Sequence, residues 1–416
     1  MKKIFIFITF IFFSLQCLSQ ATKKVLFLGN SYTTTNNLPF LISNIARSNG
    51  DSLVYQMNAP GGYTLQEHST NTTSLSKIKA KAWDFVVLQE QSQLPSFPIH
   101  QVQTNVFPYA RKLDSLIRLN NNCTETMFFQ TWGRKNGDAS NCTGWQPVCT
   151  YEGMDSLLQE RYRMMAVQNN AVISPAGAVW NYIRKHYPFI ALYTGDGSHP
   201  SPAGSYAAAC CFYTVLFRKN PLHISYDFSL PAQTAASIRD AVKTVVFDDM
   251  RNWFIGEFDP LAGFSYLVTD SNTVRFTNHS SNGGDYRWDF GDGGQSVEKD
   301  PAHNYSVSGQ YTVTLITNSC NQSDTSIQLV WVPAPVSIPG AVSLYPNPVI
   351  SKLTVDLAGN QLQQLAVFNS MGQQLAPAIH AAGNTFTLDL SKWPPGPYFI
   401  RLNLKDQVIT KKIIKR

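Results

Sequence analysis

Short apolar runs alternate with longer amphipathic stretches through roughly residues 24–256. Residues 38–48 and 178–187, between such runs, have the pattern typical of helices. Strands that alternate with helices indicate a parallel sheet covered by helices on its faces. Because such sheets bind ligands beyond the carboxyl ends of their strands, the residues after each run are the first candidates for a site. The runs are Val25–Leu28, Val54–Met57, Trp83–Leu88, Thr126–Gln130 and Ala171–Ser174.

The pattern changes in the second half of the chain. Residues 258–333 consist of short runs of alternating apolar and polar residues separated by Asn, Gly, Ser and Asp, which predicts an antiparallel β-sandwich. A proline-rich linker is expected at 334–341. Residues 342–416 again contain short β-like runs with Gly and Pro turns. We therefore expect three domains, the first of them at residues 22–257.

Residues 1–21 have the three parts of a secretory signal peptide. Two lysines at 2–3 precede the apolar stretch 4–15, and small residues at 19–21 offer a cleavage point. An uncleaved anchor is the alternative. A lipoprotein attached through Cys17 is disfavoured, because a bulky glutamine precedes that cysteine.

Charge and hydropathy exclude two classes of protein. The formal net charge is +6, but the surplus is spread along the chain and gathers mainly in the last dozen residues. A nucleic-acid-binding protein normally concentrates Lys and Arg on one face. After the signal peptide no apolar run reaches the length of about 18 residues that a transmembrane helix needs, so none is expected.

Export allows disulfides to persist. Cys142 and Cys149 lie close together in a loop rich in Gly, Asn and Pro, and we predict that they pair. Cys210 and Cys211 lie in an apolar helical run and are predicted to be buried. No Cys or His spacing fits a zinc site, so no structural metal is expected.

Ser31 and the pair Asp196 and His199 are the candidates for catalysis. Ser31 directly follows the first apolar run, and a strand-to-helix turn exposes a serine hydroxyl beside free backbone N–H groups, as an oxyanion-forming nucleophile requires. Asp196 precedes His199 by three residues, and such an acid can orient a histidine base. The alternatives are a helix cap at Ser31 and an ordinary surface loop at 196–199.

Five further residues are candidates for the site, and all but His68 follow other strand ends. The unobstructed N–H of Gly62 and the side-chain amide of Gln91 are candidate oxyanion donors, although each also fits a turn. Trp132 is a candidate for stacking on a sugar ring, with core packing as the alternative. Glu90 either faces the substrate or caps a helix. His68 is either a substrate-side or a structural histidine.

In their order, these motifs resemble the SGNH (GDSL-like) hydrolase superfamily over roughly residues 24–256. The resemblance implies a flavodoxin-like α/β/α fold. It also implies that Ser31 is the nucleophile, Gly62 an oxyanion donor, Asp196 the acid that orients the histidine, and His199 the base. There are two departures: Gly-Asn-Ser replaces the usual Gly-Asp-Ser, and Gln-Glu-Gln-Ser replaces Gly-x-Asn-Asp, so that Gln91 stands where the asparagine donor would be.

Two further resemblances cover the second half of the chain. Trp-Asp-Phe-Gly-Asp-Gly at 288–293 and Pro-Ala-His-Asn-Tyr at 301–305 resemble a PKD repeat. That family is an immunoglobulin-like β-sandwich that acts as a spacer or as a weak protein- or glycan-binding module. The resemblance places Trp288 and Tyr311 in its core.

The motifs Leu-Tyr-Pro-Asn-Pro at 344–348, Val-Phe-Asn-Ser-Met-Gly at 367–372 and Gly-Pro-Tyr-Phe-Ile at 396–400 precede a basic tail. They resemble the C-terminal sorting domain of type IX secretion. This implies a small C-terminal β-sandwich, recognition by the type IX machinery, and passage across the outer membrane to release or surface attachment.

The sequence therefore predicts a multidomain, secreted or cell-surface serine esterase. We expect it to deacylate carbohydrate esters, with acetyl esters favoured, and to need no metal or organic cofactor. One alternative is a non-catalytic surface protein that binds glycans or proteins through the same scaffold. A lipase-like or thioesterase-like hydrolase is the other.

Overall fold

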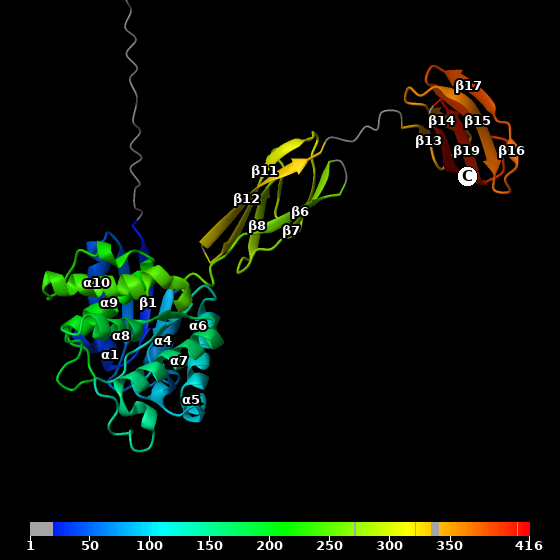
Figure 1. Cartoon of the computed structure of the whole chain (residues 1–416). Helices are drawn as coiled ribbons and strands as arrows, with labels where there is room; N and C mark the ends of the chain where they lie inside the picture. Colours follow the sequence, from blue (N-terminus) through cyan, green and yellow to red (C-terminus); the bar gives the residue numbers. More distant parts are fainter. Residues whose placement is uncertain (1–19, 270–271, 321, 334–340, 406) are drawn as a thin grey trace, which may run out of the picture. The chain divides into compact units, whose positions relative to one another are not determined.

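The computed structural model describes residues 20–269, 272–320, 322–333, 341–405 and 407–416 (Figure 1). Nearly all of the expected signal peptide at 1–21, and of the expected linker at 334–341, lies outside these ranges. The backbone divides into two compact units, and the first holds the chain up to Gly263 with segments 280–286 and 316–325. The expected domain boundaries stay predictions.

The first unit is built on a five-stranded sheet with the order β2-β1-β3-β4-β5. All neighbouring strands are parallel, and Leu28 of β1 is in register with Asn58 of β2 and Leu88 of β3. This is the flavodoxin-like order, so the expected α/β/α fold is confirmed. The strands are β1 (Thr22–Leu28), β2 (Ser52–Asn58), β3 (Phe85–Leu88), β4 (Glu125–Phe129) and β5 (Val172–Ser174).

Helices cover both faces of this sheet (Figure 1). One layer consists of α2 (Leu38–Ser48), α8 (Ala176–His186), α9 (Pro202–Phe217) and α10 (Ala232–Val245). The other consists of α4 (Thr72–Lys79), α6 (Phe107–Asn120) and α7 (Tyr151–Asn169). Shorter elements are α1 (Ser31–Thr34), α3 (Leu65–His68), α5 (Ile99–Asn105) and five 3₁₀ turns, η1 (Thr35–Asn37), η2 (Leu94–Ser96), η3 (Gln146–Cys149), η4 (Pro221–His223) and η5 (Phe247–Trp253).

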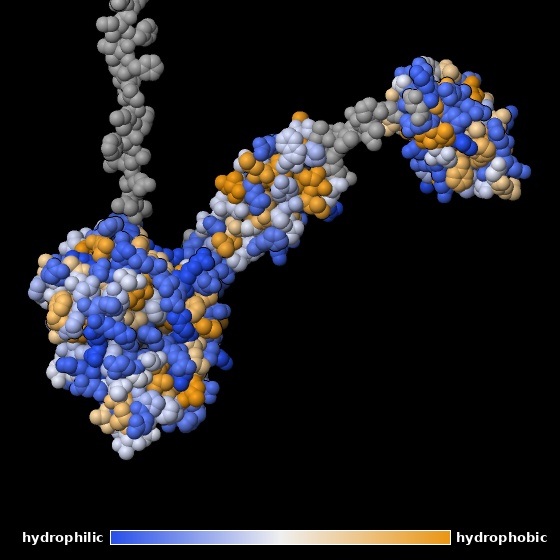
Figure 2. All heavy atoms as spheres, in the orientation of Figure 1, coloured by the Kyte–Doolittle hydropathy of each residue, from blue (hydrophilic) through white to orange (hydrophobic). Residues whose placement is uncertain are grey.

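The core of the α/β domain lies between the sheet and these layers. Strand β3 is buried along its whole length, and α9 is buried from Ala203 to Phe217, which explains why both are apolar without alternation. On the face of this domain that Figure 2 shows, hydrophilic residues dominate and hydrophobic residues form small separate patches.

The PKD-like region contains two antiparallel sheets. One has the order β10-β7-β6 and the other β12-β11-β8-β9. Trp288 is buried between Phe264 and Phe276 of the facing sheet, as expected, whereas Tyr311 is half-buried against Tyr305. The strands are β6 (Phe264–Val268), β7 (Thr273–Asn278), β8 (Asp285–Asp289), β9 (Gln295–Ser296), β10 (Ala302–Asn304), β11 (Gly309–Ser319) and β12 (Gln322–Val332).

The C-terminal region is a second small sandwich. Its sheets have the orders β13-β14-β18-β17 and β16-β15-β19-β20, and both contribute side chains to one apolar core. The strands are β13 (Ser343–Tyr345), β14 (Lys352–Asp356), β15 (Leu362–Asn369), β16 (Gln374–Leu375), β17 (Ala378–Ala382), β18 (Thr385–Asp389), β19 (Gly396–Leu404) and β20 (Val408–Lys415).

The cysteines confirm two expectations and add one bond. Cys142 pairs with Cys149, and Cys210 and Cys211 are free and buried in α9. The structure also joins Cys123 to Cys320, for which no pairing was predicted and which are 197 residues apart.

In the part of the chain that the structure describes, no helix is both long and apolar enough to span a bilayer.

Candidate active site

Ser31 lies at the first position of α1, immediately beyond the carboxyl end of β1. Asn30 is the N-cap of this helix, and its Oδ1 accepts a hydrogen bond from the Tyr32 N–H. Gly29 makes the sharp turn possible, because a Cβ there would lie 2.5 Å from Thr33 Oγ1 and 2.6 Å from Gln89 Oε1. The Ser31 N–H is among the first N–H groups of the helix, which have no acceptor within it.

A buried amide pair fixes this turn. The Asn30 N–H donates to Gln89 Oε1 at 2.9 Å, and Gln89 Nε2 donates to Asn30 Oδ1 at 2.8 Å. Asn30 Nδ2 also donates to the Tyr63 carbonyl at 2.9 Å. The loops after β1, β2 and β3 are thus tied together. Sequence reasoning missed Gln89, although the replacement of the usual aspartate by Asn30 was a signal that a side-chain amide was required here.

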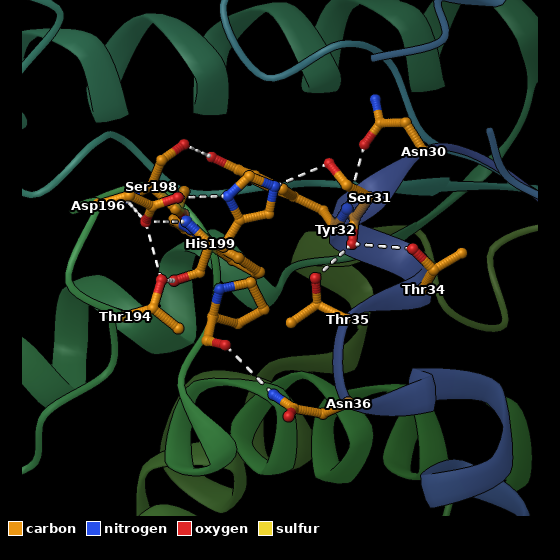
Figure 3. A network of polar contacts seen from close by, with 12 residues as sticks. Asn30, Ser31, Tyr32, Thr34, Thr35, Asn36, Thr194, Asp196, Ser198 and His199 are labelled. Atoms are coloured by element: carbon orange, nitrogen blue, oxygen red, sulfur yellow. Dashed lines mark hydrogen bonds and ion pairs between the residues drawn. The ribbon is translucent and has the colours of Figure 1, made fainter. Parts of the chain in front are cut away.

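Ser31, His199 and Asp196 come together in a continuous hydrogen-bonded line (Figure 3). His199 Nε2 lies 2.9 Å from Ser31 Oγ, and His199 Nδ1 lies 2.5 Å from Asp196 Oδ2. The ring can thus take a proton from the serine hydroxyl while the carboxylate holds the tautomer. The site is open, since the side chains of His199 and Asp196 are 36% and 48% exposed.

The loop from Thr194 to His199 is shaped around the Asp196 carboxylate. Asp196 Oδ1 accepts hydrogen bonds from the backbone N–H groups of Ser198 and His199 and from the Thr194 hydroxyl. Partial burial by itself raises the pKa of Asp196, but the hydrogen bonds from His199, Ser198 and Thr194 outweigh it and lower the pKa overall. Asp196 is therefore held as a carboxylate.

Trp132 was a candidate for stacking on a sugar ring, with core packing as the alternative, and the structure corrects the first interpretation in favour of the second. Its side chain is fully buried, with its ring stacked between those of Tyr32, at 4.9 Å, and Trp180, at 3.7 Å. Trp132 Nε1 donates to the Ser198 carbonyl at 3.1 Å, and Tyr32 Oη lies 2.7 Å from Ser198 Oγ. Both residues support the histidine loop from below, so Trp132 acts on the site through packing.

Glu90 and His68 were each candidates for either a substrate contact or a structural role, and the structure corrects the substrate contact for both. Both side chains are fully buried. His68 lies between Ser74 Oγ, 2.7 Å from its Nδ1, and the Gly29 carbonyl, 2.8 Å from its Nε2. Burial lowers the pKa of His68. It is therefore a structural histidine beneath the Ser31 turn.

Glu90 holds the loop that contains Gly62. Its Oε1 accepts hydrogen bonds from the N–H groups of Gln91, at 2.6 Å, and Leu65, at 3.2 Å, and its Oε2 is buried without a partner among the described residues. Burial raises the pKa of Glu90 to about 8. The raised pKa favours the protonated form at neutral pH, and because the side chain is fully buried it cannot contact a solvent-exposed substrate.

Gly62 and Gln91 remain candidate oxyanion donors. Gly62 is exposed and has a φ of +74°, which favours glycine, and the turn's own hydrogen bond runs from the Tyr63 N–H to the Pro60 carbonyl. Gln91 Oε1 accepts the N–H groups of Gln93 and Leu94, and its Nε2 donates to Gln93 Oε1 at 3.0 Å. An amide nitrogen carries two hydrogens, so one remains for another acceptor.

A buried aspartate extends this network. Asp138 is fully buried, and its Oδ2 accepts a 2.6 Å hydrogen bond from Gln93 Nε2, the same side chain that orients Gln91. Arg134 pairs with the other carboxylate oxygen at 3.2 Å. Sequence reasoning missed Asp138, because its partner Gln93 is 45 residues away and nothing local marks the aspartate as buried.

Two family matches cover the second half of the chain. Residues 259–332 match the family described as PKD domain, and residues 343–416 match the family described as secretion system C-terminal sorting domain. A curated relative, the pre-pro-metalloprotease PrtV of Vibrio cholerae, is 34% identical over 90 residues, which are 21% of this chain. The chain spans only about 10% of the length of that relative.

Two solved structures resemble the chain over its α/β region. A DUF4886 family protein from Bacteroides uniformis is 17% identical, with a TM-score of 0.48, over 55% of this chain and 95% of that chain. A putative SGNH hydrolase from Slackia heliotrinireducens is 24% identical, with a TM-score of 0.38, over 46% and 97% of the two chains. These likenesses assign no substrate and no catalytic residue.

The chain thus combines a flavodoxin-like α/β/α domain with a region that matches the PKD domain family and a region that matches the secretion system C-terminal sorting domain family.

Proposed function

We propose that the protein is an exported serine esterase in which Ser31 is the nucleophile, His199 the base and Asp196 the acid that orients it. The observation that carries the proposal is the contact of His199 Nε2 with Ser31 Oγ at 2.9 Å, with Asp196 bound to the other ring nitrogen. Geometry of this kind, on a turn with free helical N–H groups, is what acyl transfer requires.

The reaction takes two stages. Ser31 Oγ attacks the ester carbonyl while its proton moves to His199 Nε2, and the C=O bond becomes a C–O⁻ bond. When the intermediate collapses, the ester C–O bond breaks and the alcohol leaves with the proton from Nε2. A water molecule then attacks the acyl-serine in the same way, with His199 again accepting a proton and returning it to Ser31.

Three donors are proposed for the oxyanion. The N–H groups of Ser31 and Gly62 are the first two, and the remaining hydrogen of the Gln91 amide is the third. The loops that present them are held in place by Asn30 and Glu90. Such preorganised donors need no rearrangement when negative charge develops.

A carbohydrate acyl ester, in particular an acetyl ester, is the proposed substrate. The match to the sorting domain supports export to the cell surface or medium, where polysaccharides are met. The exposure of His199 and Asp196 supports a substrate too large for a closed pocket. Lipase-like and thioesterase-like specificities predict a preference for long acyl chains instead.

Hydrolysis of aryl esters tests the proposal. The full-length protein should release p-nitrophenol from p-nitrophenyl acetate faster than from a p-nitrophenyl ester of a long-chain fatty acid. Ser31→Ala should abolish both reactions. If the wild-type protein has no activity on any of these esters, the non-catalytic binding function takes its place.

A further inference from the structure

A basic cavity lies beside the loop that carries His199. The cavity has a volume of about 350 Å³ and is lined by residues that include Lys135, Arg184, Phe189 and Tyr193. The Lys135 N–H donates to the Gly197 carbonyl at 2.8 Å, which joins the wall of the cavity to the loop between Asp196 and His199. The cavity therefore adjoins the loop that places His199 against Ser31.

Both charged side chains that line the cavity are cations. In the described part of the chain, neither Lys135 nor Arg184 has a carboxylate within ion-pair distance. The Arg184 guanidinium is fixed in place, 3.8 Å from the centre of the Tyr151 ring and within hydrogen-bond reach of the Lys135 carbonyl. Two unpaired cations in one concave site favour an anionic ligand.

The buried carboxyl of Asp155 does not cancel this charge. It accepts hydrogen bonds from the Gly133 N–H and from Asn181 Nδ2, and neither cation bonds to it. Burial raises the pKa of Asp155 to about 6, so most of the carboxyl is ionised at pH 7, where it attracts Arg184 without bonding to it. One buried carboxylate against two cations still leaves the cavity with a surplus of positive charge.

An aromatic ring at the same site indicates what kind of anion fits. Phe189 is 68% exposed and lines the cavity, and Tyr193 lies on the same wall. Aromatic faces pack against the apolar faces of sugar rings, while guanidinium and ammonium groups bind carboxylates and sulfates. The combination favours an acidic sugar over a small inorganic anion.

We propose that this basic cavity binds an anionic sugar unit of the polysaccharide whose neighbouring acyl ester is cleaved at Ser31. The inference rests on the proposed esterase function and narrows its substrate to acidic polysaccharides. A uronate carboxylate and a sulfate ester present the same chemistry to Lys135 and Arg184.

Binding to the full-length Ser31→Ala protein tests the inference without catalysis. The probes are tetragalacturonate, a sulfated carrageenan tetrasaccharide and neutral xylotetraose, measured by isothermal titration calorimetry. One of the acidic probes should bind at least about tenfold more tightly than xylotetraose, equivalent to about 1.4 kcal/mol. The tighter of the two acidic probes identifies the anion. Added NaCl should weaken this binding.

Variants that reverse or remove one positive charge test whether the acidic probe binds in this cavity. Lys135→Glu, made in the Ser31→Ala protein, should reduce affinity for the acidic probe at least about tenfold and leave xylotetraose unaffected. Arg184→Gln should act in the same direction, with its melting temperature recorded because Arg184 also packs on Tyr151. Lys185→Glu is the matched control, because Lys185 is exposed on the same helix and does not line the cavity.

The outcomes separate this inference from the esterase proposal. Equal binding of acidic and neutral probes, no binding of any probe, or an unchanged affinity in Lys135→Glu would each overturn the basic cavity as an anionic subsite. Aryl acetate hydrolysis by the wild-type protein would still support the esterase in all three cases. Conversely, if the protein binds an acidic probe but has no esterase activity, the anionic subsite is supported and the proposed esterase reaction is contradicted.

Discussion

Asn30 and Gln89 exchange two hydrogen bonds, from the Asn30 N–H to Gln89 Oε1 at 2.9 Å and from Gln89 Nε2 to Asn30 Oδ1 at 2.8 Å. This pair joins the turn of Ser31 to the end of β3. Because Asn30 Nδ2 also holds the Tyr63 carbonyl, next to Gly62, one side chain positions both proposed backbone donors.

Asn30→Asp should therefore impair turnover even though it restores the aspartate usual in the superfamily. The variant loses the donor to the Tyr63 carbonyl and sets a carboxylate oxygen against it, while Oδ1 can still accept from Gln89 and Tyr32. We expect kcat/KM on p-nitrophenyl acetate to fall about tenfold. Asn105→Asp, an exposed change on α5, is the control. An unchanged rate in Asn30→Asp would show that Asn30 does not position the donors.

Gln91→Ala tests the third oxyanion donor. If the amide binds the oxyanion, kcat should fall about 10²–10³-fold with little change in KM, as for the loss of one such donor elsewhere. Gln93→Ala should cause a smaller loss, because it leaves the Gln91 amide in place and removes the acceptor that orients it, together with a donor to Asp138. Unchanged turnover in Gln91→Ala would remove this side chain from the site and leave the two backbone N–H groups.

Glu90→Gln should change how stability depends on pH. Burial raises the pKa of Glu90 to about 8, so the folded state retains a proton that the unfolded state has lost. This linkage makes wild-type stability fall as pH rises from about 4.5 to about 8, by at most about 1.4 kcal/mol per pH unit. Glu90→Gln has no such proton to lose. The melting temperature of the variant, relative to that of the wild type, should therefore rise as pH increases from about 4.5 to about 8. Exposed Glu160→Gln is the control, and parallel curves for Glu90→Gln and wild type would contradict the buried, protonated state.

Asp196→Asn should lower kcat by about 10²–10⁴, because the amide no longer fixes the His199 tautomer or stabilises the charged ring. The pKa of Asp196 lies below the ordinary value, so its contribution to stability is complete above about pH 4 and is lost only as pH falls further. Loss of wild-type activity between about pH 4 and 7 should therefore come from a group other than Asp196.

The control for this experiment is Asp248→Asn, which removes a half-exposed carboxylate from a surface ion pair with Lys243. Its pH–rate profile should match that of the wild type. A kcat in Asp196→Asn within a few-fold of the wild-type value would contradict the role of the acid.

Much of the fold could be predicted from periodicity and order. The helix expected at residues 38–48 is α2 with the same bounds, and the one expected at 178–187 is α8, shifted by one or two residues. The ends of the apolar runs predicted that Ser31 and Gly62 lie just beyond strands. The meeting of Ser31 with His199 followed from the resemblance, since 168 residues separate them.

The direction of individual side chains could not be predicted in the same way. Trp132, Glu90 and His68 follow strand ends or lie near them, yet their burial depends on rings and loops packed over them from distant segments. Likewise, no local sequence pattern predicts the disulfide between Cys123 and Cys320. Sequence position placed these residues at the correct edge of the sheet, and tertiary packing decided which of them face solvent.

Covalent labelling tests the central claim most directly. The exported protein, treated with a fluorophosphonate and digested, should carry one adduct that mass spectrometry places on Ser31, and His199→Ala should suppress it. An adduct on another serine, or no adduct on an active protein, would contradict the assignment of Ser31 as the nucleophile.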